Sequence, residues 1–152
     1  MIRKYIGGLG VLAMAFGAGV LVGNGPLVQA QSKNRVLEIR TYTAHPGRLN
    51  ALIQRMGHGE NKVFAKVGMP PLGFFVANEA PKSEDTFVYI LAHESREGAK
   101  ANWDKFRNDP EWKDLRAKSE ADGPIVAKVE SIFVNPLDFS PLDSMTIAKL
   151  AK

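Results

Sequence analysis

The stretch Asn108-Asp109-Pro110-Glu111-Trp112 carries the strongest local structural signal in this chain. Asp109 is suited to cap a helix, because its carboxylate can accept hydrogen bonds from the free backbone N–H groups of the first turn. Pro110 fits the first helical position, and Glu111 favours the positive end of the helix. Trp112 then falls on the buried side. The stretch predicts the start of a short helix, with Asp109, Pro110, Glu111 and Trp112 as its structural motif.

The segments on either side alternate between strand and helix patterns. Period-two alternation of apolar and polar residues indicates strands, and an apolar stripe at helical spacing indicates helices. Gly57 and Gly59 interrupt one such stripe and predict a kink. The expected order is strand 35–43, helix 46–68, strand 72–78, strand 86–93, helix 96–108, short helix 110–123 and strand 127–135. This order, βαββαβ with an extra short helix, is the ferredoxin-like pattern of an α+β domain.

A ferredoxin-like unit covers one sheet face with helices and leaves the other face open. We expect small apolar residues beneath the helices, namely Leu37, Ile39, Val88, Ile90 and Ala92. The alternate set would then lie on the open face: Glu38, Arg40, Tyr42, Phe87, Tyr89, Leu91 and His93. Such a face would be a large apolar patch on a monomer. A second copy packed sheet to sheet would cover it, giving a homodimer with a cavity between the sheets.

Five residues are the candidates for that cavity: Glu38, Arg40, Tyr42, Tyr89 and His93. His93 could act as a base or an axial metal ligand, or it could cap the strand end or hydrogen-bond to Glu94 or Arg40 in a structural network. Arg40 could hold an anion or pair with Glu38. The two tyrosines could donate to a carbonyl or serve as packing groups. Each of these alternatives stays open at the level of sequence.

Composition excludes several classes of site and partner. The chain has no cysteine, and its three histidines lack the spacing of a metal site, so we expect no metal and no cofactor. Removing Arg3 and Lys4 with a leader leaves 18 basic against 16 acidic residues. The nearly equal numbers of basic and acidic residues, and the lack of a block of Lys and Arg, argue against a nucleic-acid-binding surface.

The N-terminus has the pattern of a secretory signal peptide. Arg3 and Lys4 precede an apolar run from Tyr5 to Val22, and Val28-Gln29-Ala30 offers a small-residue cleavage site. We expect a leader at 1–30, a linker at 31–34, the domain at 35–142 and a tail at 143–152. The protein should therefore be exported, to the periplasm or beyond. An uncleaved membrane anchor is the alternative, and only that alternative would place the chain on a membrane.

Six stretches taken in order resemble the NIPSNAP family of small proteins of the dimeric α/β-barrel group. They are 37–43 (LEIRTYT), 68–69 (GM), 73–76 (GFFV), 89–96 (YILAHESR), 106–112 (FRNDPEW) and 138–142 (DFSPL). The resemblance implies a ferredoxin-like subunit and dimerisation, but the family lacks an agreed reaction. We favour a domain that binds a small molecule or a partner. A cofactor-independent monooxygenase or isomerase-type enzyme is the alternative, because related barrels include such enzymes.

Overall fold

The computed structural model describes residues 36–137, 139–142 and 149. The expected domain at 35–142 lies almost wholly within these residues. The leader at 1–30 and the linker at 31–34 lie outside them, and so does the tail at 143–152 apart from Lys149.

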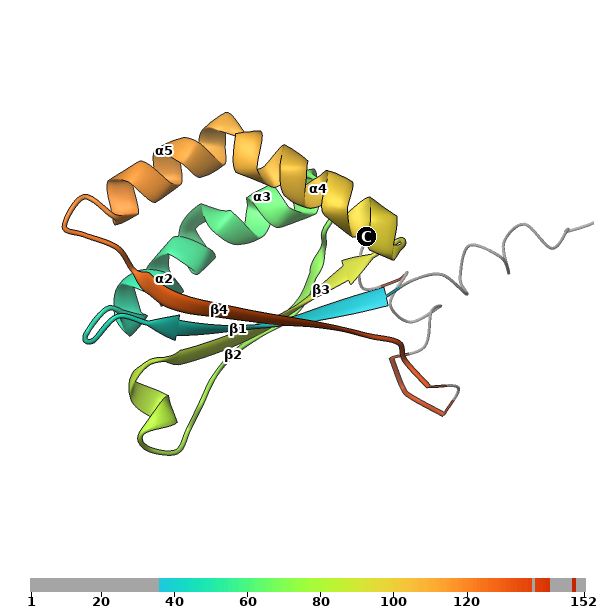
Figure 1. Cartoon of the computed structure of the whole chain (residues 1–152), viewed down its shortest axis with the longest axis horizontal. Coiled ribbons are helices and arrows are strands. Elements are labelled where there is room, and N and C mark those ends of the chain that lie inside the picture. The colour runs from blue at the N-terminus through green and yellow to red at the C-terminus, as the bar shows by residue number, and fades with distance from the viewer. Residues whose placement is uncertain (1–35, 138, 143–148, 150–152) are drawn as a thin grey trace, which may run out of the picture.

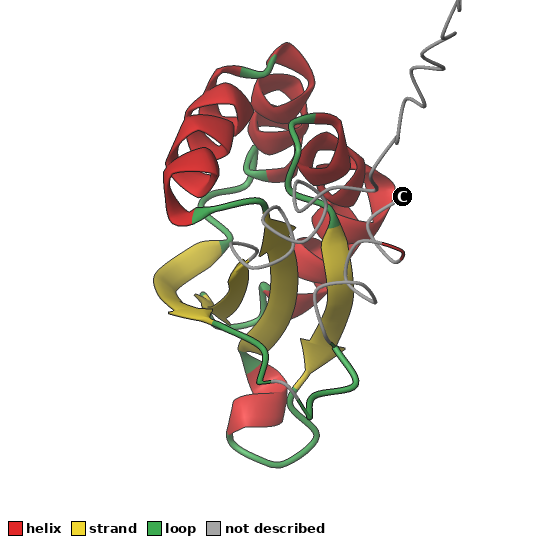
Figure 2. Cartoon of the chain, turned by 90° about the vertical axis from the view of Figure 1, so that its right-hand side faces the viewer, coloured by secondary structure: helices red, strands yellow, loops and turns green. Residues whose placement is uncertain are grey.

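The elements follow the predicted order. They are β1 (Val36–Ala44), α2 (Leu49–Arg55), the π-helical turn η1 (Met56–Glu60), α3 (Asn61–Lys66), β2 (Pro71–Val76), the 3₁₀ turn η2 (Lys82–Glu84), β3 (Thr86–His93), α4 (Arg96–Asn108), α5 (Pro110–Ser119) and β4 (Val126–Val134). The strands form one antiparallel sheet in the order β2-β3-β1-β4. Helices α2 to α5 gather on one face of this sheet (Figures 1 and 2). The ferredoxin-like α+β fold is thereby confirmed.

The predicted kink lies at η1, between α2 and α3. Space is tight at Gly59, since a Cβ atom on it would lie 3.1 Å from the Cδ2 atom of Leu115, which would have to shift by a few tenths of an ångström. Leu115 belongs to α5, so the missing side chain lets α5 approach the kinked helix closely. The interruption in the apolar stripe therefore serves helix packing.

The motif at the start of α5 forms as predicted. The Asp109 carboxylate accepts hydrogen bonds from the backbone N–H groups of Glu111 at 2.9 Å and Trp112 at 3.3 Å, with Pro110 in the first turn. The Trp112 ring lies 4.6 Å from that of Phe106, centroid to centroid. Trp112 is only half-buried, so it borders the core instead of filling its centre.

The two faces of the sheet are reversed relative to the sequence prediction. The residues expected on the open face lie beneath the helices: Glu38, Arg40, Tyr42, Phe87, Tyr89, Leu91 and His93. The residues expected beneath the helices line the uncovered face, where Leu142 also packs: Leu37, Ile39, Val88, Ile90 and Ala92. Period-two patterning separates the two groups correctly, but it does not say which group the helices cover.

The reason for the reversal is the size of the side chains that fill the space under the helices. Phe64 of α3 stacks on Tyr89 at 5.5 Å and on Phe106 of α4 at 4.8 Å between ring centroids. Large aromatic residues on the sheet are needed to reach these rings. The smaller aliphatic residues could not fill this layer, so they face the other way.

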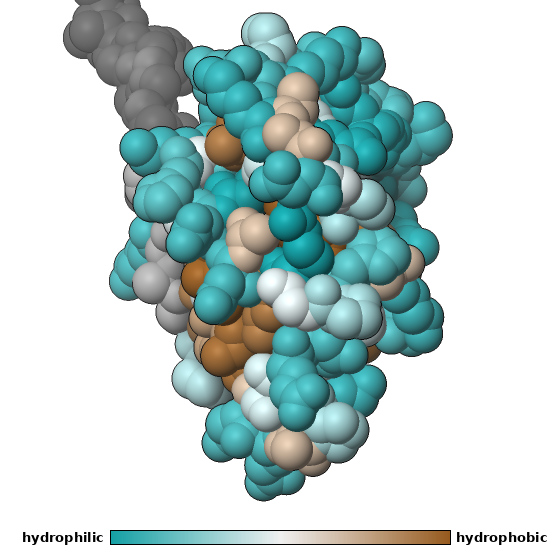
Figure 3. Space-filling view, turned by 90° about the vertical axis from the view of Figure 1, so that its left-hand side faces the viewer, coloured by the Kyte–Doolittle hydropathy of each residue, from teal (hydrophilic) through white to brown (hydrophobic). Residues whose placement is uncertain are grey.

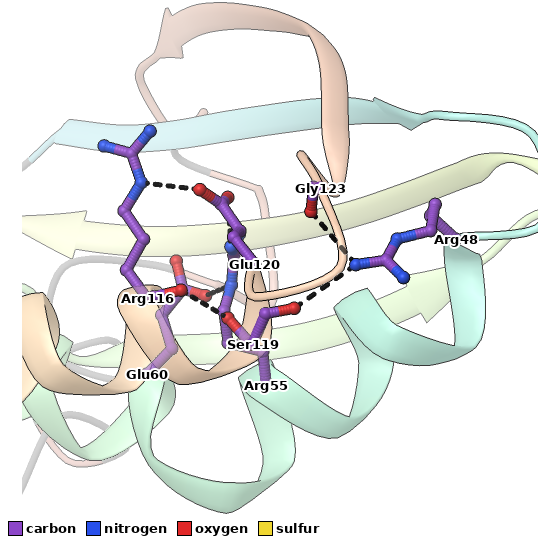
Figure 4. A network of polar contacts seen from close by, with 7 residues as sticks. All are labelled: Arg48, Arg55, Glu60, Arg116, Ser119, Glu120 and Gly123. Carbon is purple, nitrogen blue, oxygen red and sulfur yellow. Dashed lines mark hydrogen bonds and ion pairs between the residues drawn. The ribbon is translucent and has the colours of Figure 1, made fainter.

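A second, polar cluster joins α2, η1 and α5 at the end of the molecule shown in Figure 3. That end is mostly hydrophilic, with a hydrophobic area at the level of the sheet. Arg55 is 4% exposed and lies between two carboxylates (Figure 4). Its Nε donates to Glu60 and its Nη1 to Glu120, both at 2.9 Å. Arg48 also donates to the carbonyl groups of Ser119 and Gly123, which holds the end of α5 against the start of α2.

The Arg55 cluster gives a stability prediction. Arg55→Ala should lower the free energy of unfolding by about 3–5 kcal/mol, because it leaves the buried Glu60 carboxylate without its partner. Arg116→Ala is the matched control, since Arg116 contacts the same Glu120 from the surface at 3.0 Å. That change should cost less than about 1 kcal/mol. Urea unfolding at neutral pH measures both, and equal losses would contradict the buried role of Arg55.

Candidate functional site

The side chain of Glu38 is the centre of the polar contacts beneath α4. The residue is 1% exposed, yet its carboxylate accepts hydrogen bonds from side chains on four other residues. One oxygen receives Nη1 of Arg40 and Oγ of Ser131, each at 2.6 Å. The other receives Nε2 of His93 at 2.9 Å and Nε1 of Trp103 at 2.8 Å. A buried carboxylate is thereby fully satisfied.

These donors come together because of the sheet register and one helix cap. Arg40 on β1 pairs with Ser131 on β4, and β3 pairs with β1 on its other side. The Ser95 hydroxyl accepts a hydrogen bond from the backbone of Gly98 and so fixes where α4 begins. Trp103 then falls on the buried side of α4, directly over β1. Three strands and one helix therefore supply the groups around Glu38.

The surroundings of Glu38 keep it ionised. Burial by itself raises the pKa of the carboxyl, but the hydrogen bonds from His93, Ser131, Trp103 and Arg40 outweigh this and lower the pKa to about 2. A carboxylate with such a low pKa and with four donors already bound is a poor proton acceptor. Its role is to position its partners.

His93 is one of those partners. Its side chain is 0% exposed, and because an ionised carboxylate only accepts, the Nε2 atom must carry the proton. The Nδ1 atom is buried without a hydrogen-bond partner among the described residues. His93 therefore lies behind Glu38, closed off from any ligand. The structure places it in a polar network, but its partner is Glu38 and not the Glu94 or Arg40 that the sequence hypothesis named.

Arg40 faces a pocket, unlike His93. Its guanidinium donates to Glu38 and lies with Cζ 4.2 Å from the centre of the Trp103 ring. The side chain is 15% exposed, and its Nε has no hydrogen-bond partner within the described part of the chain. The pocket has a volume of about 540 Å³ and is lined by Glu38, Arg40, Arg96, Glu97, Lys100, Trp103, Arg107 and Phe133. Because the Nε atom is itself buried, Nη2, which makes no hydrogen bond to a described residue, is the part of the Arg40 guanidinium left for a ligand.

The pocket is basic. Its lining contains four cationic side chains and two carboxylates, and Glu38 is already neutralised by Arg40. Lys100 and Arg107 both pair with the exposed Asp104. The Arg96 guanidinium lies over Phe133, with Cζ 3.7 Å from the ring centre. Aromatic walls and surplus positive charge suit an organic anion.

The two tyrosines form a separate pair. The Tyr89 hydroxyl donates to that of Tyr42 at 2.7 Å, and burial raises the pKa of both phenols. Neither residue lines the pocket beside Arg40. Of the five candidates, the structure brings Glu38 and Arg40 to the pocket and leaves Tyr42, Tyr89 and His93 inside the core.

Sequence reasoning missed seven residues that belong to the site: Arg96, Glu97, Lys100, Trp103, Arg107, Ser131 and Phe133. One of them left a usable signal. A buried indole N–H requires an acceptor, so a tryptophan on the buried side of α4 implies a polar group on the sheet below. Ser131 and Phe133 could not be placed, because the register of β4 decides which of its residues reach β1. The charged residues of α4 could not be placed because their side of the helix borders the sheet face that the sequence assigned in reverse.

No group of three or more His, Asp or Glu side chains in the described ranges is arranged to hold a metal ion. Within the same residues, no helix has the length and apolar character needed to cross a bilayer.

Comparison with known proteins identifies the domain. The model of the NIPSNAP family matches residues 37–141, which is more than half of the chain. This chain belongs to the NIPSNAP family. The suspected resemblance is thereby confirmed. The chain matches no curated protein.

Solved structures of bacterial NIPSNAP proteins have the same fold. A NIPSNAP-like domain protein from Burkholderia xenovorans is 19% identical, with a TM-score of 0.62 over 72% of this chain and 91% of its own. A NIPSNAP family protein from Agrobacterium tumefaciens gives the same identity, TM-score and share of this chain, over 99% of its own. A second one from that organism, of unknown function, is 22% identical, with a TM-score of 0.61 over 72% and 94%. At these identities the likeness establishes the fold alone.

The Glu38 network of this NIPSNAP domain makes a pH-dependent prediction. Glu38 contributes stability above its usual pKa of 4.5, and the contribution disappears as the pH falls through about 2. Glu38→Gln should therefore lower the free energy of unfolding by about 3 kcal/mol at pH 7, and the gap to wild type should narrow between pH 4.5 and 2. Chemical unfolding across this range measures the gap.

Glu97→Gln is the matched control for this prediction. Glu97 lines the same pocket but is exposed, so its removal should leave the stability curve almost unchanged at every pH. A Glu38→Gln curve that runs parallel to wild type down to pH 2 would contradict the ionised network.

Proposed function

We propose that this NIPSNAP domain binds a small organic anion in the basic pocket between α4 and the β1–β4 edge of the sheet. The observation that carries the proposal is the state of Arg40. Its guanidinium is fixed from one side by Glu38 and from another by the face of Trp103, while its Nη2 makes no hydrogen bond to a described residue. A cation held in place before binding loses little entropy when an anion arrives.

The size and charge of the pocket support the same proposal. A volume of about 540 Å³ is in the range of sites for small molecules. Arg96 and Lys100 stand on successive turns of α4 and are exposed, so they can turn toward an anion on Arg40. The pocket therefore combines one rigid and several adaptable cations.

The geometry favours binding over the enzymatic alternative. A monooxygenase or isomerase acting without a cofactor would need a group that can take a proton from the substrate. Glu38 has all its acceptor positions filled, and His93 is enclosed behind it. The pocket wall beside Arg40 therefore offers hydrogen-bond donors and aromatic rings that can hold a ligand. Its one buried carboxylate, Glu38, already accepts four hydrogen bonds.

Titration calorimetry at low salt tests anion binding. A panel of small carboxylates and inorganic phosphate should bind the wild-type protein. Arg40→Gln should weaken the affinity roughly 10- to 100-fold, as expected for the loss of a charge-assisted hydrogen bond. Arg96→Gln provides an independent test that leaves the core intact, because Arg96 is exposed. It should weaken binding by a smaller factor.

Lys118→Gln is the control for a general effect of charge. Lys118 is also an exposed cation on a helix, but it pairs with Asp114 away from the pocket. Its removal should leave the affinity unchanged. The proposal fails if no anion in the panel binds, or if Arg40→Gln and Arg96→Gln both bind as tightly as wild type.

We also propose that the protein is a homodimer through the uncovered face of its sheet. The reversed faces move the expected interface away from Leu91, which is buried, to the other set of side chains. Phe75 is 52% and Ile132 59% exposed on that face, beside the half-buried Ile39, Val88 and Ile90. Covering such a patch stabilises a dimer by roughly 25 cal/mol per Å² of apolar surface.

Sedimentation at micromolar concentration tests the dimer with two neighbouring residues of β2. Phe75→Arg should shift the protein toward monomers, because a charge would be buried in the interface. Val76→Arg is the matched control, since Val76 is 50% exposed but points to the other face of the same strand. That variant should stay dimeric. A monomeric wild-type protein would rule the dimer out.

Export remains part of the proposal. It rests on the leader pattern at 1–30, with cleavage after Ala30. The intact mass of protein recovered from the periplasm or medium should begin at Gln31. Recovery only from membranes, with Met1 retained, would replace cleavage with an anchor.

A further inference from the structure

A second pocket adjoins the basic one at the edge of the sheet. Its volume is about 810 Å³, and it is lined by Val36, Arg96, Ser131, Ile132, Phe133 and Asn135. Arg96 and Phe133 line both pockets, so the two cavities meet at these side chains. A ligand bound to Arg40 therefore has a path out of the basic pocket along β4.

The two pockets differ in character. Four cationic side chains line the first pocket. Among the described residues that line the second pocket, only Arg96 is charged. The second pocket has an apolar wall made of Val36 and the ring of Phe133, both of them half-buried. An apolar wall next to a basic pocket suits a ligand that has a charged group at one end and an apolar chain at the other.

The boundary between the pockets is a movable side chain. Arg96 lies on the face of Phe133, with Cζ 3.7 Å from the ring centre, and its own side chain is exposed. Within the described ranges no ion pair holds its guanidinium. If Arg96 turned toward an anion on Arg40, the Phe133 ring would become free to contact an apolar chain.

We propose that the ligand is a soluble single-chain amphiphilic carboxylate. This inference rests on the proposed anion site. The carboxylate binds Arg40 in the basic pocket, and Arg96 leaves Phe133 to pair with it. The alkyl chain then crosses the Phe133 ring and lies on Val36 in the second pocket. Compact anions would use only the first of the two cavities.

Calorimetry with unbranched carboxylates tests this inference. The series runs from acetate to decanoate, each below the concentration at which it forms micelles. Affinity for the wild-type protein should rise by about three- to fourfold per methylene group once the chain reaches the apolar wall. Alkyltrimethylammonium ions of the same chain lengths should not bind, because their head groups are repelled by the basic pocket.

One variant and one control locate the chain. Val36→Asn should reduce the gain per methylene while leaving the affinity for inorganic phosphate unchanged. Val129→Asn is the control, since Val129 is a 46% exposed valine on β4 that lines neither pocket. It should retain the full gain.

The outcomes separate this inference from the proposed function. If phosphate and short carboxylates bind in an Arg40-dependent way but affinity does not rise with chain length, the amphiphile is wrong and the anion site stands. If the gain with length persists in Arg40→Gln, the chains bind elsewhere and the inference is overturned. If no anion of any length binds, both proposals fail.

Discussion

The buried carboxylate of Glu38 is the constraint on which the rest of this structure depends. An ionised group with 1% of its surface exposed is tolerated only when donors replace the water it has lost. Four side chains do this, from β1, β3, β4 and α4. The sheet register positions the donors on the strands, and the N-cap of α4 positions Trp103. The network therefore ties α4 to the sheet at one place and makes any other arrangement costly.

The same constraint creates the pocket. Glu38 accepts hydrogen bonds from Arg40 and Trp103. These bonds hold the Arg40 guanidinium and the face of the Trp103 indole at the edge where α4 meets β4. The charge of Glu38 cancels one cation, and the remaining cations on α4 leave the pocket basic. Stability and ligand chemistry are thus linked through one residue. A substitution at Glu38 should disturb both, whereas one at Arg96 should disturb binding alone.

Much of the fold could be read from the sequence, since its signals are local. The cap at Asp109, the kink near Gly59 and the period of β1 and β3 depend on neighbouring residues only. The site depended on two facts that periodicity does not contain. One is which sheet face the helices cover, and the other is the register that sets Ser131 beside Arg40. The faces were therefore assigned in reverse, and His93 was predicted to face a cavity although it is enclosed.

The most direct test of this account is the ionisation of Glu38 itself. The carbon-13 resonance of its side-chain carboxyl, followed by NMR through an acid titration, reports the pKa of that group alone. The four hydrogen bonds predict a value of about 2, against the ordinary 4.5. The Arg40→Gln variant should titrate at a higher pH, because one of the four donors is altered. A value at or above 4.5 in the wild-type protein would mean that burial dominates, and that Glu38 does not hold Arg40 as an ion pair.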